Sequence, residues 1–120
     1  MHEAGIAQGI LDIVIQYVPP DRAHAITGVR VRVGEMAGVM PESLEFCFDA
    51  IVAGTPYRSA HLALERVPTV LACDACGGRA EPDAHTFLCP ACHSPRVRLA
   101  SGMDLQVVDI EIDDRLAEVS

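Results

Sequence analysis

Apolar residues recur at helical spacing near the start of the chain and alternate with polar residues soon after. Between Glu3 and Val18 they form one stripe, which predicts an amphipathic helix with these residues buried: Ile6, Ile10, Ile13, Val14 and Tyr17. Leu11, Ile15 and Val18 widen the stripe, so we expect the helix to be covered on more than one side. The two prolines of "VPPDR" end this helix. The stretch "ITGVRVRVGE" then alternates valine with arginine, as a half-buried strand does.

The rest of the chain predicts a second helix and two further strands on either side of a cysteine-rich insert. The segment "GEMAGVMPESLEFCFDAIV" contains the helix, and Pro41 suits its first turn. Its expected buried face is Leu44, Phe48, Ile51 and Val52. The segment "SAHLALERV" predicts a strand with Leu62 and Leu64 on one face. Between Cys73 and Arg98 large apolar residues are scarce, and "MDLQVVDIEI" then alternates again.

Four of the five cysteines form two pairs, Cys73-x-x-Cys76 and Cys89-x-x-Cys92. Each pair can aim two sulfurs at one point through a tight turn, and two such turns make the closed tetrahedral site of structural zinc. Metal binding would supply the folding free energy that this segment cannot obtain by burial, on the order of 10 kcal/mol or more. A rubredoxin-like iron site is the main alternative. Disulfides are disfavoured in a reducing cytosol, and a thioredoxin-like redox site does not need a second cysteine pair.

The remaining cysteine and two histidines near the pairs have simpler expected roles. His93 follows the second pair directly and His85 lies in the loop before it. Either could replace a sulfur, but with four cysteines present we expect them beside the metal site or in solvent. Cys47 lies in the apolar pattern of the second helix and is expected to be a small buried hydrophobe.

Together these segments predict an α+β fold, with a small mixed β-sheet, two helices and an inserted four-cysteine, zinc-ribbon-like module. The chain leaves a main domain at the cysteine-rich segment and rejoins it at the last strand. The expected domains are residues 1–70 with 99–120, and residues 71–98. At 120 residues with half of them hydrophobic, the chain can form a core.

The composition of the chain limits the binding partners and the cellular compartment that we expect for it. The chain has 9 arginines, no lysine and 17 acidic residues, for a net charge of −8. This charge repels phosphate backbones and disfavours nucleic-acid binding, although solubility alone also explains it. The first 18 residues lack basic residues and include Glu3 and Asp12, so they predict neither a secretion signal nor a membrane span. We expect a cytoplasmic protein.

The chain starts "MHEAGIAQG", which places His2 and Glu3 directly before the first helix. A solvated histidine, and a glutamate that stabilises the first helical turn, are the simple interpretations. However, a histidine at position 2 can also offer its imidazole Nδ1, its own amide nitrogen and the amine of Met1 to one ion. A nitrogen-rich square-planar site of this kind selects Ni(II) or Cu(II).

Three blocks of the sequence resemble the HypA/HybF family of hydrogenase-maturation nickel metallochaperones. They are "MHE", "VRVGEMAGVMPESLEFCFDAI", and "CDACG…CPACHSPRV" followed by "GMDLQVVDIEI". The resemblance implies a nickel-binding α/β domain (1–70 and 99–120) and a zinc-binding domain (71–98). It implies nickel binding at His2 and Glu3, and zinc binding at Cys73, Cys76, Cys89 and Cys92. Some relatives carry a histidine near each cysteine pair; here His93 matches the second pair, but two glycines follow the first.

The resemblance further implies delivery of Ni(II) to the [NiFe]-hydrogenase large subunit with a partner GTPase, and urease is a second candidate client. Metal delivery accounts for the "MHE" start and for the absence of a recognisable catalytic constellation, so we expect no enzyme. A zinc-ribbon module for nucleic acid or protein interaction, without nickel, is the alternative. It does not account for the charge of −8 or for an aromatic content of 4%. The oligomeric state, including a homodimer, stays open.

Overall fold

The computed structural model describes residues 2–82 and 87–117, which form two compact units. The helical unit comprises Met1–Arg32, Val39–Glu65 and Gln106–Ser120. The cysteine unit comprises Val33–Gly38 and Arg66–Leu105. The second unit contains the whole cysteine-rich segment together with short stretches on both sides of it. The assignment of metal-binding domains to residues 1–70 with 99–120 and to 71–98 stays a prediction.

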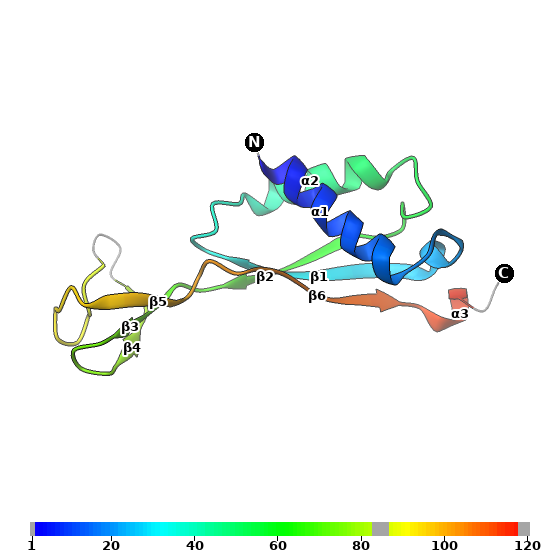
Figure 1. The fold of residues 1–120 in the computed structure, drawn as a ribbon. Helices are drawn as coiled ribbons and strands as arrows, with labels where there is room; N and C mark the ends of the chain where they lie inside the picture. The colour runs from blue at the N-terminus through cyan, green and yellow to red at the C-terminus, as the bar shows by residue number, and fades with distance from the viewer. Residues whose placement is uncertain (1, 83–86, 118–120) are drawn as a thin grey trace. The chain divides into compact units, whose positions relative to one another are not determined.

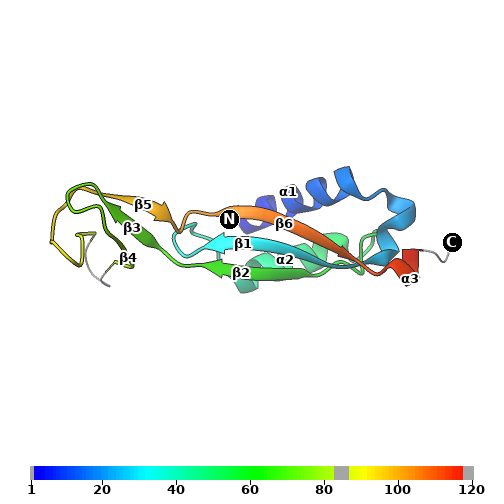
Figure 2. The same ribbon diagram turned by 90° about the horizontal axis from the view of Figure 1, so that it is seen from below.

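The helical unit is a three-stranded sheet with two helices on one face (Figure 1). Its elements are α1 (His2–Tyr17), the 3-10 helix η1 (Pro20–Ala25), β1 (Ile26–Gly34), α2 (Pro41–Val52), β2 (Leu62–Val67), β6 (Leu105–Ile112) and α3 (Asp114–Ala117). The strand order is β2-β1-β6. β1 and β2 run in the same direction and β6 in the opposite one (Figure 2). The predicted small mixed sheet with two helices is therefore confirmed.

Strand β1 is the central strand, and its alternation explains the sheet. Val29 and Val31 are buried beneath the helices, whereas Arg30 and Arg32 are exposed. Arg30 forms a forked ion pair with Asp109 of β6, with a shortest N···O distance of 2.6 Å. Arg32 lies 3.5 Å from a carboxylate of β2. The valines thus form the core while the arginines join the three strands on the open face of the sheet.

Helix α1 buries a narrower stripe than the sequence pattern predicted. The buried apolar residues of the helix are Ala7, Ile10, Leu11 and Val14, and Val18 directly after it is buried as well. The expectation was wrong for Ile13 and Tyr17, which are 37% and 72% exposed. Ile15, expected to be covered, is also exposed. One sheet face and one neighbouring helix cover only part of the circumference of α1, so the remaining apolar residues face outward.

Helix α2 begins and ends as its sequence indicates. Pro41 occupies its first position, where the missing N–H removes no helical hydrogen bond. Leu44, Phe48 and Val52 are buried, and Cys47 is half-buried rather than fully enclosed. The Tyr57 hydroxyl, in the segment after α2, donates a hydrogen bond of 2.6 Å to the Val18 carbonyl. This bond ties the end of α1 to the connection that leads to β2.

The cysteine unit is built on a second small sheet with the order β4-β3-β5. It comprises β3 (Val70–Cys73), β4 (Arg79–Ala80) and β5 (Val97–Ser101), and β3 pairs antiparallel with both neighbours. Sequence periodicity did not predict these strands, because segments of two to five residues are too short for alternation to be visible. The sheet positions the two cysteine pairs.

A close backbone crossing lies within the same unit. The Gly34 N–H donates to the Asp104 carbonyl, and the Met36 N–H donates to the Gly102 carbonyl, both at 2.7 Å. A β-carbon on Gly34 would overlap the carbonyl group of Gly102. The two segments can approach this closely only because position 34 has no side chain.

Candidate metal sites

The two cysteine pairs form matching turns that are closed by the same hydrogen bonds. In the first, Cys73 N–H donates to the Gly78 carbonyl and Gly77 N–H to the Cys73 carbonyl, both at 2.9 Å. In the second, Cys89 N–H donates to the Ser94 carbonyl at 3.0 Å. There, the N–H at position 93 donates back to the Cys89 carbonyl at 2.8 Å. The first turn begins where β3 ends, and the second lies before β5. Each turn therefore holds its two cysteines in one fixed arrangement.

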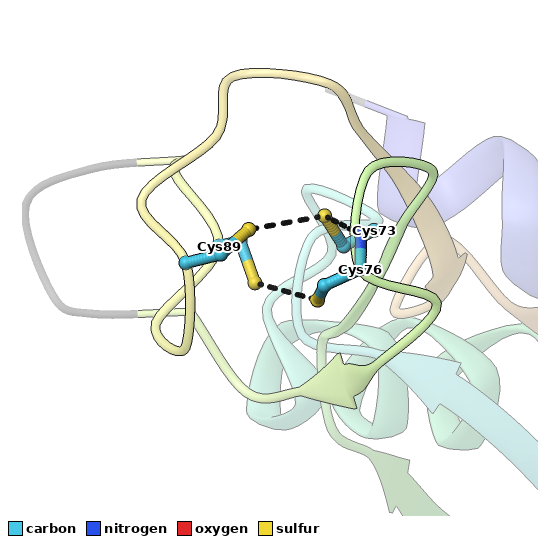
Figure 3. A group of neighbouring side chains, drawn as sticks. Cys73, Cys76 and Cys89 are labelled. Carbon is cyan, nitrogen blue, oxygen red and sulfur yellow. Dashed lines mark hydrogen bonds between the residues drawn. The ribbon is translucent and has the colours of Figure 1, made fainter.

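The four sulfur atoms converge on a single point. The Sγ atoms of Cys73 and Cys92 lie 3.6 Å apart, and those of Cys76 and Cys89 lie 3.7 Å apart. All four lie within 4.8 Å of one another. Figure 3 shows the sulfurs of the labelled cysteines turned toward each other.

These separations match a metal site and not disulfides. Four sulfurs at a Zn–S distance of 2.3 Å form a tetrahedron with edges of about 3.8 Å, whereas a disulfide joins its sulfurs at about 2.05 Å. A four-thiolate donor set in this geometry suits zinc, and the same donors also suit iron. The residues thus fit a structural zinc ion.

Backbone amides prepare the first cysteine of each turn for metal binding. The Cys76 N–H lies 3.4 Å from the Cys73 sulfur and lowers the pKa of that thiol. The N–H groups of Cys92 and Ala91 act in the same way and lower the pKa of Cys89 to about 6. The pKa values of Cys76 and Cys92 are raised instead, that of Cys92 to about 12. The thiolate is the form that binds metal, so binding at this cluster must be coupled to loss of protons. Cys73 and Cys89 are buried, while Cys76 and Cys92 are exposed.

The residue after each cysteine pair has left-handed backbone geometry. Gly77 has φ of 75° and His93 has φ of 61°. Glycine adopts this region freely, whereas a residue with a β-carbon is strained there. His93 is exposed, as expected for a histidine beside the site, and His85 lies outside the described residues. The equivalence of positions 77 and 93 was not predicted from the sequence, although "CDACG" and "CPACH" carry the signal.

The other predicted site lies at the start of α1. His2 is the first residue of this helix, but its side chain and the whole of Met1 lie outside the described part of the chain. Glu3 is only 8% exposed, and its carboxylate accepts a hydrogen bond of 3.2 Å from the Met40 N–H. This bond, together with one from its own backbone N–H, lowers the pKa of Glu3.

The Glu3 contact joins the beginnings of two helices. Met40 is the N-cap residue of α2 and has no side-chain capping bond. The Glu3 carboxylate takes the place of the carboxylate that satisfies this N–H in a capping box. Sequence reasoning assigned Glu3 to the first turn of α1 and did not find this second role. The contact spans 37 residues of sequence, so no local pattern reveals it.

Comparison with known proteins matches most of the chain to one family. A family model described as "Hydrogenase/urease nickel incorporation, metallochaperone, hypA" matches residues 1–112. The chain belongs to the HypA family. The hydrogenase maturation factor HypA of Streptomyces avermitilis is 39% identical over 116 residues, covering 95% of this chain and 88% of the relative. That of Chlorobaculum parvum is 36% identical over 113 residues, covering 94% and 100%.

Solved HypA structures share the fold of this chain. The solution structure of the nickel metallochaperone HypA from Helicobacter pylori has a TM-score of 0.64 and 22% identity, covering 93% of this chain and 97% of the other. A second HypA solution structure has a TM-score of 0.69 at the same identity, covering 93% and 96%. The family resemblance and the α+β fold class are confirmed. No helix within residues 2–82 and 87–117 is long and apolar enough to cross a membrane.

Proposed function

We propose that this HypA-family chain binds Ni(II) at its N-terminus and delivers it during maturation of [NiFe]-hydrogenase, with urease as a second candidate client. The observation that carries the proposal is the family match, because it begins at residue 1 and includes His2, Glu3 and all four paired cysteines. The family's function is nickel incorporation by a metallochaperone. Nickel is therefore the cargo, and the protein is not an enzyme.

In this proposal the nickel donors are the His2 imidazole, the His2 amide nitrogen and the Met1 amine. These nitrogen donors favour the square-planar geometry of Ni(II). Glu3 completes or positions the site. Its hydrogen bond to Met40 and its burial at the start of α1 support the positioning role. A site at a chain end also suits release, because few packed contacts must break when the metal leaves.

Zinc is proposed as the resident metal of the cysteine unit, held by Cys73, Cys76, Cys89 and Cys92. Zinc bound there supplies folding free energy and no catalytic chemistry. The proposal is supported by the sulfur separations of 3.6 and 3.7 Å and by the approach of all four sulfurs to within 4.8 Å of one another. The chain itself contributes two pre-formed turns, so the metal fixes their mutual position and makes this unit a rigid docking surface.

The proposed partners are a hydrogenase-maturation GTPase and the [NiFe]-hydrogenase large subunit. Nucleic acid and membranes are not expected partners, because both carry phosphate and the chain carries a net charge of −8. We place the protein in the cytoplasm, where these partners mature. A homodimer remains compatible with this function.

Nickel titration of untagged protein tests the proposal. We expect about one Ni(II) per chain in addition to zinc, with a weak visible band if the site is planar. His2→Ala should abolish nickel binding without changing the zinc content. His61→Ala, which removes an exposed histidine elsewhere in the helical unit, is the matched control and should bind normally.

Two residues added before Met1 test the amine separately. This change keeps every side chain but replaces the terminal amine and moves the histidine from position 2. We expect nickel binding to be lost. Unchanged binding by the extended protein would show that the amine is not a ligand, and unchanged binding by His2→Ala would reject the N-terminal site altogether.

Zinc analysis tests the second metal. Protein as purified should contain about one zinc per chain. Cys76→Ala should lower this ratio and unfold the cysteine unit locally, whereas Cys47→Ala on α2 should not change it. Full zinc occupancy in a Cys76→Ala, Cys89→Ala double variant would refute the assignment, and a red protein containing iron would favour the rubredoxin-like alternative.

A further inference from the structure

The outward face of α2 carries an exposed aromatic ring among carboxylates. Glu42, Glu45, Phe46 and Asp49 follow the helical spacing i, i+3, i+4 and i+7, and all four are exposed. Phe46 is 74% exposed, more than any other large apolar residue described in this chain. Helix α2 lies on the same face of the sheet as α1 (Figure 1), and its buried residues are Leu44, Phe48 and Val52. The four residues above lie on the part of the helix that is exposed to solvent. We call this set the α2 outer face.

The charges of this face are poorly compensated within the chain. Within residues 2–82 and 87–117, neither Glu42 nor Glu45 has an ion-pair partner, and Asp49 lies 3.5 Å from the exposed His61. Carboxylates three and four residues apart on one helix repel each other. Asp49 also lies near the C-terminal end of α2, where the helix dipole disfavours negative charge and the last turn has no basic residue. A cationic partner would relieve both effects.

Phe46 gives the same face an apolar anchor. Burial of a phenylalanine side chain contributes about 1.5–3 kcal/mol, and this ring obtains little of that in the free protein. Single exposed apolar residues are common, so exposure alone assigns nothing. Here, however, the ring lies one helical turn from both Glu42 and Asp49, so an apolar side chain and negative charges share one exposed surface. Protein interfaces concentrate much of their binding energy in a few such anchor residues that have polar groups beside them.

The negative charge of the α2 outer face determines which partner can bind there. A second copy of this chain, related by a two-fold axis, would place these carboxylates against one another. Nucleic acid and anionic membranes would be repelled for the same reason. We propose that the α2 outer face docks a protein partner whose surface has an apolar pocket for Phe46 with arginine or lysine beside it. This inference rests on the proposed function only for its probes, the maturation GTPase and the hydrogenase large subunit.

Binding of each probe to full-length, metal-loaded variants tests the surface. We expect Phe46→Ala to raise the Kd at least tenfold for one of the two probes. Glu45→Lys should slow association with the same probe at low salt, and the difference should shrink as salt increases. Tyr17→Ala removes a ring that is 72% exposed on α1, and Asp12→Lys makes the same charge change on α1. Both controls should bind like the unaltered protein.

The outcomes separate this inference from the proposed function. Loss of probe binding in the two α2 variants, with nickel titration unchanged, supports the docking face. Unaltered affinity of Phe46→Ala for both probes overturns it, and so does an equal loss of affinity in the α1 controls. If the unaltered protein binds neither of the two probes, the inference is overturned as well. Failure of the proposed function is read independently, from nickel titration of the His2→Ala variant.

Discussion

The matching turns around the cysteine pairs allow an exchange test at one backbone position. Gly77 and His93 occupy equivalent places, donate equivalent hydrogen bonds and share left-handed φ values of 75° and 61°. Only His93 carries a β-carbon and its strain. Gly77→Ala should therefore introduce into the first turn the strain that His93→Gly removes from the second.

The magnitude follows from two opposing effects. Left-handed geometry costs about 1–2 kcal/mol for a residue with a β-carbon. Replacement of glycine by alanine stabilises the folded protein by about 0.4–1 kcal/mol, because it reduces the conformational entropy of the unfolded chain. A β-carbon on Gly77 would meet nothing within 4 Å, so no steric effect is added. The net change is about 0.5–1 kcal/mol, destabilising for Gly77→Ala and stabilising for His93→Gly.

Zinc competition with a chromophoric chelator measures this change, because folding of the turns and metal binding are coupled. A change of 0.5–1 kcal/mol corresponds to an apparent zinc affinity about two- to fivefold lower for Gly77→Ala, and higher by the same factor for His93→Gly. Gly54→Ala is the control. It makes the same substitution at an open position without left-handed geometry, and should leave zinc affinity unchanged.

Two results would refute this reasoning. Equal zinc affinity of Gly77→Ala and the unaltered protein would show that the backbone relaxes without strain. Weaker zinc retention by His93→Gly would show that the imidazole contributes to the metal site, and that its contribution outweighs the strain at that position.

Three further predictions concern the folded scaffold. Gly34→Ala should destabilise the cysteine unit severely, because its β-carbon overlaps the Gly102 carbonyl; proton–deuterium exchange would show the loss of protection. Tyr57→Phe should lower the free energy of unfolding by about 1–3 kcal/mol in urea titrations, because a buried carbonyl at the end of α1 loses its donor. The Arg30 hydrogen bond lowers the pKa of Asp109, so this pair stabilises the fold above the ordinary aspartate pKa. A double-mutant cycle of Arg30→Gln and Asp109→Asn, measured by thermal melts, gives the interaction free energy of the pair. This free energy should vanish as pH falls through the lowered pKa of Asp109; an interaction free energy that does not change with pH would contradict the prediction.

The fold was predictable where one face of a helix or strand is buried and the other is exposed to solvent. The alternation of β1 and the apolar face of α2 behind Pro41 are of this kind, and both elements form where expected. The error at Ile13 and Tyr17 has a physical origin. Several stripes of α1 are apolar, and only tertiary packing decides which of them meets the sheet and α2.

The candidate sites show the same division between local and distant information. Spacing alone brought the four cysteines into one predicted cluster, since each tight turn is encoded within six residues. The bond between Glu3 and Met40 was not predictable, because it depends on how α1 and α2 align at their first turns. The strands of the cysteine unit were missed because segments of two to five residues are too short to show a period.

The bond between Glu3 and Met40 has a consequence for a dication at His2. It brings the first turns of α1 and α2 together, so the positive ends of two helix dipoles meet where nickel is proposed to bind. Helix N-termini attract anions and repel cations, and the first-turn carboxylates Glu3 of α1 and Glu42 of α2 offset part of this field. Nickel there would be chelated strongly by nitrogen donors but held against an electrostatic gradient. This repulsion lowers the free-energy cost of releasing nickel. Transfer is therefore favoured once an acceptor supplies ligands in a less positive environment.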